Sequence, residues 1–128
     1  MLRLILTSLV SLGITTTLYA EDWVFVPSKE NACNIRVFYD RSMIKKDILV
    51  EKYDVSQTTD PDCSKRNQTS LIYKSKMNCE TGELTSISQY FYYKDGTVRG
   101  SEDSAPSTYK ASGTPKLMLH SACQMKYQ

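Results

Sequence analysis

Four cysteines are the residues of this 128-residue chain whose type and spacing most directly imply chemistry. Cysteine thiolates bind zinc, or they pair into disulfides where the compartment is oxidising. The chain contains no C-x-x-C pair, and its single histidine is His120, so the set does not match a zinc site. We therefore expect two disulfides. Four cysteines allow three pairings, and we favour Cys33–Cys63 together with Cys79–Cys123.

The single histidine is the natural candidate for acid–base catalysis. His120 is followed directly by Ser121, and adjacent residues on a helix do not face each other, so they do not form a nucleophile with its base. The motifs G-x-S-x-G, H-E-x-x-H and the P-loop are also missing from the sequence. We therefore predict no catalytic residues and no cofactor, and we do not expect the protein to be an enzyme.

Three carboxylates raise the question of a calcium site: Asp54, Asp60 and Asp62. The spacing of an EF-hand loop, with its glycine and its closing glutamate, is not present. Aspartate side chains also bond the backbone of turns, and this stretch contains turn residues such as Pro61. We favour solvated turn carboxylates and no metal site, and the sequence alone leaves ion binding at these residues open.

The first 20 residues have the pattern of a secretory signal peptide. Arg3 supplies a positive charge, the stretch 4–18 is largely apolar, and Ala20 is a small residue at the expected cleavage point. The rival interpretation, an uncleaved membrane anchor, is disfavoured because the run is short and rich in hydroxyl residues. Cleavage would leave residues 21–128 as one exported domain without a membrane span. The formal charge of +2 is too small to favour nucleic acid as a partner.

Alternation of apolar and polar residues predicts a series of strands. The expected strands are 23–26, 34–39, 48–55, 70–79 and 84–93, with a short one at 98–99. In the fourth of these, one parity carries Leu71, Tyr73, Met77 and Cys79, so these side chains should share one face of the sheet. The polar stretches 56–68 and 100–113 are expected to be long loops.

A short helix is expected at the end of the chain. Thr114 would be its N-cap and Pro115 would lie in its first turn. Its apolar side carries Met118, Leu119, Ala122 and Met125. Strands followed by one helix indicate an α+β domain, a small antiparallel sheet packed by one short C-terminal helix and stapled by disulfides. A helix covering the Leu71/Cys79 face would bring Cys123 within reach of Cys79.

Tyrosines gather late in the strand 84–93. Tyr90 and Tyr92 share their parity with Leu84, and burial on one face of the strand with cross-strand packing on the other would explain these aromatic residues. The functional interpretation is an exposed tyrosine surface for a partner, because tyrosine is enriched at interfaces. Lys74 and Lys76 could supply polar contacts to such a partner, although a solvated strand face also explains them. We take Lys74, Lys76, Tyr90 and Tyr92 as candidate binding residues.

Several short motifs along residues 23–123 resemble the bacterial surface-adhesin protein E-like family. They are Asp40-x-Ser42-x-Ile44, Lys52-Tyr53-Asp54, Asn78-Cys79, Gly96-Thr97-Val98, and a C-terminal Ala122-Cys123. The resemblance implies a small antiparallel sheet with a C-terminal helix, tied by a disulfide that maps onto Cys79–Cys123. It also implies a place at the envelope of a Gram-negative bacterium, binding of host proteins and dimerisation through the sheet. The pair Cys33 and Cys63, and the lack of a lipid-attachment cysteine, depart from the family pattern.

Two functional hypotheses follow. The first is an exported, non-enzymatic binding protein of the cell envelope, located in the periplasm or at the surface, that contacts a protein partner through one face of its sheet. The alternative is a periplasmic or secreted inhibitor of a hydrolase such as lysozyme, since rigid loops lose little entropy on binding. The loop Ser56–Gln68 would then be the inhibitory segment.

Overall fold

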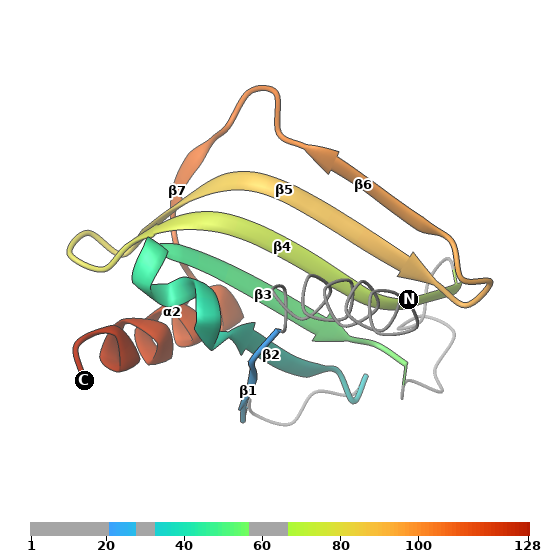
Figure 1. Cartoon of the computed structure of the whole chain (residues 1–128), viewed down its shortest axis with the longest axis horizontal. Helices are drawn as coiled ribbons and strands as arrows, with labels where there is room; N and C mark the ends of the chain where they lie inside the picture. The colour runs from blue at the N-terminus through green and yellow to red at the C-terminus, as the bar shows by residue number, and fades with distance from the viewer. Residues whose placement is uncertain (1–20, 28–32, 57–66) are drawn as a thin grey trace, which may run out of the picture.

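The computed structural model describes residues 21–27, 33–56 and 67–128, and these form an antiparallel sheet of seven strands with a C-terminal helix (Figure 1). The strands are β1 (Trp23–Val26), β2 (Arg36–Asp40), β3 (Ile48–Asp54), β4 (Gln68–Asn78), β5 (Glu83–Tyr93), β6 (Val98–Glu102) and β7 (Thr108–Lys110). They lie in the order β1-β2-β3-β4-β5-β6. β6 pairs with the C-terminal half of β5, and β7 pairs with the start of β5. A 3-10 helix, η2 (Arg41–Lys46), joins β2 to β3, and α2 (Gly113–Lys126) follows β7.

The expected antiparallel sheet with one C-terminal helix is therefore confirmed, but the loop predicted at 100–113 is partly wrong. β6 extends to Glu102, and β7 occupies Thr108–Lys110 within that stretch. Both strands lie at the edge of the sheet and are exposed along their whole length. Backbone pairing with β5 holds them, so they need no apolar face, and the alternation that marks a half-buried strand is missing from their sequence.

The start of α2 also differs from the prediction. Its N-cap is Ser112, whose side chain makes no capping hydrogen bond, and not Thr114. Gly113 has a φ of 60°, in the left-handed region that favours glycine, so the chain can turn into the helix one residue before the expected cap. Pro115 lies in the first turn as predicted, where its missing N–H costs no hydrogen bond. The helix then runs for 14 residues, longer than expected.

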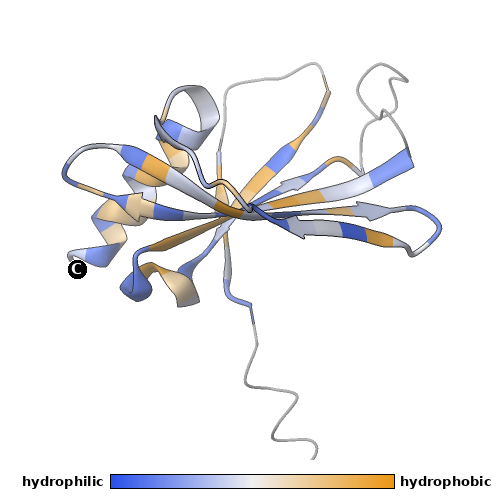
Figure 2. Cartoon of the chain, turned by 90° about the horizontal axis from the view of Figure 1, so that it is seen from above, coloured by the Kyte–Doolittle hydropathy of each residue, from blue (hydrophilic) through white to orange (hydrophobic). Residues whose placement is uncertain are grey.

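The hydrophobic core lies between α2 and one face of the sheet, which we call the helix face. Met118, Leu119 and Ala122 of α2 are buried as predicted. They cluster with buried residues of the strands and of η2: Val26, Val37, Tyr39, Ile44, Leu49, Met77 and Leu84. Along the strands hydrophobic and hydrophilic residues alternate, as Figure 2 shows, so the opposite face of the sheet, the open face, carries the other parity.

The helix covers only part of the helix face. It packs against η2, β3 and β2, so that it lies beside the β2–β3 side of the sheet (Figure 1). Four residues in and just after β4 were expected under the helix. Met77 belongs to the core and Cys79 packs against it, while Leu71 and Tyr73 are only half-buried. The four side chains thus share the helix face as predicted, but α2 does not cover the part of this face around Leu71.

A β-bulge in β5 changes which side chains share a face. Ser75 of β4 pairs with Ser86, but the preceding residue Lys74 pairs with Ser88, so Ile87 is an extra residue. Leu84 therefore points to the helix face opposite Met77. Beyond the bulge the parity is reversed, so Tyr90 and Tyr92 point to the open face and not to the side of Leu84, as the unbroken alternation predicted.

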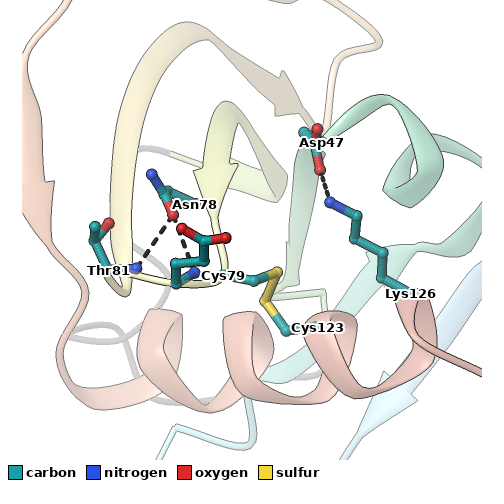
Figure 3. The surroundings of a disulfide bond; sticks show 7 residues. Asp47, Asn78, Cys79, Thr81, Cys123 and Lys126 are labelled. Carbon is teal, nitrogen blue, oxygen red and sulfur yellow. Dashed lines mark hydrogen bonds and ion pairs between the residues drawn. A yellow bond between two sulfur atoms is a disulfide. The ribbon is translucent and has the colours of Figure 1, made fainter.

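The disulfide between Cys79 and Cys123 is present as predicted, with a Cα–Cα distance of 5.7 Å (Figure 3). It joins the end of β4 to the last turns of α2. Nearby, Lys126 forms an ion pair with Asp47, which ties the same end of the helix to the start of β3. Cys33 is also disulfide-bonded. Since Cys63 lies outside the described residues, the Cys33–Cys63 bond stays a prediction.

Removal of this disulfide should lower the free energy of unfolding markedly. The bond spans 44 residues, and the loop-entropy model gives about 4 kcal/mol for such a crosslink. We expect the double variant Cys79→Ala/Cys123→Ala to lose about 3–4 kcal/mol in urea unfolding under non-reducing conditions.

Single variants Cys79→Ala and Cys123→Ala serve as the control, because each also breaks the bond and should cost about as much as the pair. A loss below about 1 kcal/mol in the double variant would mean that helix packing alone holds α2 in place.

Candidate functional site

The open face of the sheet is the candidate functional site. Residues that are directly paired across neighbouring strands point to the same face, which places Phe38, Lys52, Ile72 and Tyr90 in one row. Tyr92 and Lys74 lie on the same face, two residues from this row. α2 packs against β2 and β3 from the helix face. In the part of the chain that the structure describes, α2 therefore does not cover the open face, and this face can meet another molecule.

A groove with a volume of about 580 Å³ crosses the open face. Its sheet side is lined by Val50, Ile72, Lys74, Tyr90 and Tyr92, and its other side by Glu21, Asp40, Ser42, Met43 and Lys46. The groove combines apolar side chains with phenol hydroxyls, ammonium groups and the carboxylates of Glu21 and Asp40. Such groups can bind another molecule by packing, hydrogen bonding and ion pairing.

Three of the four candidate binding residues are brought together. Lys74, Tyr90 and Tyr92 line the groove, and all three are half-buried. Lys76 shares the strand but is exposed, pairs with Ile48 and Thr85, and does not line the groove. The structure thus separates the two lysines that the sequence presented as equivalent.

The ring of Tyr90 is held by a glycine on the neighbouring strand. Tyr90 pairs with Gly100 of β6, and a Cβ atom at Gly100 would lie only 2.0 Å from Cδ1 of the tyrosine. The ring therefore rests directly against the glycine backbone. A fixed aromatic ring loses little conformational freedom on binding, which suits a contact residue.

A cluster of aromatic side chains around Lys52, also on the open face, was not predicted from the sequence. Lys52 Nζ lies 5.2 Å from the ring centroid of Trp23 and 5.9 Å from that of Phe38, so the lysine sits between two rings. Phe25 packs on Phe38 with centroids 5.5 Å apart and is 52% exposed. The parity of these residues was the available signal, because Phe38 is an aromatic residue on the otherwise polar side of its strand.

Aspartates at the ends of strands stabilise the connections beside the groove. Asp40 accepts hydrogen bonds from the backbone N–H of Ser42 (2.9 Å), the hydroxyl of Ser42 (2.6 Å) and the backbone N–H of Asp22 (3.1 Å). It thereby caps η2, whose Ile44 is buried in the core. The Asp40-x-Ser42-x-Ile44 motif is therefore a structural element at the edge of the groove.

Asp54 is likewise occupied by its neighbours. Partial burial raises its pKa, but hydrogen bonds from the hydroxyl and backbone N–H of Ser56 and an ion pair with Arg36 outweigh this and lower the pKa below its ordinary value. Asp60 and Asp62 lie outside the described residues. Within 21–27, 33–56 and 67–128, no group of three or more His, Cys, Asp or Glu residues could hold a metal ion.

His120 and Ser121 are not brought together. His120 is exposed on α2, whereas the hydroxyl of Ser121 lies 3.2 Å from that of Tyr39 in the core. The loop proposed for hydrolase inhibition, Ser56–Gln68, lies largely outside the described residues, as does the expected signal peptide at residues 1–20. These two expectations therefore stay predictions.

Comparison of the chain with protein-family models, with curated proteins and with solved structures found no match. The resemblance to the adhesin E-like family thus rests on the motifs in the sequence. In the part of the chain that the structure describes, no helix is both long and apolar enough to span a membrane.

The contact between Gly100 and Tyr90 can be tested by substitution. Gly100→Ala should push the tyrosine ring away from β6 and lower the free energy of unfolding by about 1–3 kcal/mol, the usual cost of overpacking. Urea unfolding of the variant measures this cost.

The matched control is Gly100→Ala in a Tyr90→Ala background, where the new methyl group has no ring to displace. There the substitution should be neutral or slightly stabilising, because alanine loses less backbone entropy than glycine. An equal cost in both backgrounds would show that the ring does not rest on Gly100.

Proposed function

We propose that the protein is an exported, non-enzymatic binding protein of the bacterial cell envelope that contacts a protein partner through its open face. The observation that carries the proposal is the convergence of Lys74, Tyr90 and Tyr92 in one groove. Two of these residues come from β5 and one from β4, and the bulge at Ile87 places them on the same side.

The chemistry of the open face favours a protein as the occupant. Tyrosine side chains supply both apolar area and a hydroxyl group, and they are frequent hot spots in protein interfaces. The exposed ring of Phe25 and the cluster of Trp23, Lys52 and Phe38 extend the surface beyond the groove. The ammonium groups of Lys52 and Lys74 favour a partner surface that presents carboxylates, since rim charges of opposite sign steer association.

The proposed location at the cell envelope has separate support. Disulfides such as Cys79–Cys123 persist in oxidising compartments, among them the periplasm and the cell exterior. The pattern of residues 1–20 and the family resemblance point the same way. Fractionation of the source cells, with protease treatment of intact cells, would separate a periplasmic location from display at the surface.

The resemblance further implies a homodimer through the sheet, which we retain as part of the proposal. Among the described strands, β6 is an exposed edge strand that no further strand pairs on its outer side, and such an edge can pair with a second copy. Sedimentation analysis of the purified protein measures its oligomeric state.

The open-face contact predicts a specific pattern of binding losses. Immobilised protein should retain a partner from extracts of host-cell surface proteins or of the bacterial envelope. The variants Tyr90→Ala and Tyr92→Ala should weaken that binding about 10-fold or more, as expected for aromatic hot spots. Lys74→Ala should weaken it more than Lys76→Ala, because only Lys74 lines the groove. Surface plasmon resonance with the purified partner gives the affinities.

The matched control is Leu117→Ala, which removes an exposed apolar side chain from α2, away from the open face. Retained binding in this control together with loss in the tyrosine variants supports the proposal. Equal binding by all variants would contradict the open-face assignment, and inhibition of lysozyme at equimolar protein would favour the hydrolase inhibitor instead.

A further inference from the structure

A second pocket, open to solvent, lies on the helix face, at the part of the sheet that α2 leaves uncovered. Its volume is about 340 Å³. Strands β3, β4 and β7 and the first turn of α2 line it with Glu51, Tyr53, Leu71, Tyr73, Tyr109 and Pro115. We call it the Glu51 pocket. It shares no lining residue with the groove of the open face.

Glu51 is the unusual residue of this pocket. It is only 3% exposed, and the hydroxyl of Tyr53 donates a hydrogen bond of 2.7 Å to its carboxylate. Among the described residues, no lysine or arginine forms an ion pair with it. Burial therefore raises the pKa of Glu51, and the Tyr53 hydrogen bond offsets only part of this increase. A buried carboxylate without a cation is costly, so the pocket gains most from a ligand that supplies a positive charge.

The tyrosines around Glu51 form walls that also favour a cation. The rings of Tyr53 and Tyr73 stand at 82° to each other with centroids 5.7 Å apart. Phe91 packs edge-on against Tyr73 at 6.3 Å and holds that wall in place. Tyr109 from β7 is 43% exposed and completes the lining. Aromatic faces carry negative potential and attract cations, most strongly where water is excluded.

We propose that the Glu51 pocket binds an organic ammonium group, with the Glu51 carboxylate as counter-ion and the rings of Tyr53, Tyr73 and Tyr109 as a cage. Leu71 and Pro115 add apolar surface for the carbon atoms of such a ligand. A metal ion suits the pocket less well, since metals prefer several charged or carbonyl oxygens and the lining supplies one carboxylate. The pocket is large enough to admit a small cation such as choline or the end of an alkylated lysine side chain.

The proposal is tested with choline as the probe, using the full mature chain and isothermal titration or the chemical shifts of the tyrosine rings. The neutral analogue 3,3-dimethylbutan-1-ol has the same shape without the charge. We expect saturable binding of choline that is at least about 10-fold tighter than binding of the neutral analogue. Equal affinities for the two molecules, or no saturable binding of choline, would overturn the proposal.

Three substitutions separate the contribution of the Glu51 charge from that of the Tyr73 ring. Glu51→Gln keeps the size of the side chain and removes its charge, so choline should bind at least about 10-fold more weakly. Tyr73→Leu removes one aromatic wall and should weaken binding similarly, whereas Tyr73→Phe keeps the ring and should retain it. Because Tyr73→Phe preserves the packing, its behaviour remains informative even if Tyr73→Leu fails to fold. Unchanged affinity in Glu51→Gln would contradict the role of the carboxylate.

Tyr90→Leu is the matched control, because it removes a half-buried tyrosine from the opposite face of the sheet. This variant should leave choline binding unchanged, but it should weaken binding of the protein partner to the open face. The two proposals can thus fail separately. A loss of choline binding in Tyr90→Leu would place the ligand on the open face and overturn the assignment to the Glu51 pocket.

The raised pKa of Glu51 also predicts how stability depends on pH. A carboxyl group whose pKa is higher in the folded than in the unfolded state favours folding when it is protonated. Its contribution is fully present below the ordinary glutamate pKa and is lost as pH rises through the raised folded-state value. Burial and the Glu51 charge raise the pKa values of Tyr53, Tyr73 and Tyr109, so these groups stay neutral in that range.

Urea unfolding across this pH range tests how much Glu51 contributes to the pH dependence of stability. Glu51→Gln should remove this part of the pH dependence and should be more stable than the parent chain at pH 7 without ligand. Saturating choline should stabilise only the parent chain, and it should therefore reduce the difference in the free energy of unfolding between the Gln variant and the parent chain. A Gln variant that is less stable than the parent at pH 7 would show that the carboxylate is already compensated within the protein.

Discussion

The attachment of α2 to one end of the sheet is the constraint on which the rest of this structure depends. A helix of 14 residues is marginal by itself in water, so its stability comes from packing and from crosslinks. Met118, Leu119 and Ala122 bury its apolar side, and the Cys79–Cys123 bond with the Lys126–Asp47 ion pair fixes its C-terminal half. A single short helix can cover only part of a seven-stranded sheet. The open face and the uncovered part of the helix face both result from the small area of the sheet that one short helix can bury.

The sequence predicted the main elements because most of them obey one simple periodicity. β1 matches its expected bounds, and β3, β4 and β5 differ from theirs by one or two residues. The edge strand β6 was predicted only over residues 98–99, and β7 was missed, since their pairing uses backbone groups and leaves no pattern of buried side chains. The bulge at Ile87 was also unpredictable, because one extra residue reverses the parity without altering composition. That single residue decides that Tyr90 and Tyr92 share a surface with Lys74. The sequence therefore supplied three of the groove residues, while only the fold could show that they meet.

Three of the motifs behind the family resemblance overlap hydrogen-bonded aspartate turns, which have a local physical explanation. In Asp40-x-Ser42, Asp54-x-Ser56 and Asp95-x-Thr97 the aspartate accepts hydrogen bonds from both the backbone N–H and the hydroxyl two residues later. This arrangement closes tight connections after strands. Similar motifs are therefore expected wherever a small sheet needs such connections. They carry information about the fold, and they carry little about what the open face binds.

The position of Glu51 follows from the same incomplete cover. Leu49, two residues earlier on β3, is fully buried and belongs to the hydrophobic core. Glu51 lies at the boundary where the helix begins, so its carboxylate lines a pocket and is not sealed into the core. Replacing it with a leucine would extend the core and would also avoid the cost of desolvating a charge. A carboxylate at this position is thus poor for stability alone. The tyrosines that surround it are the residues expected if the charge serves to hold a cation.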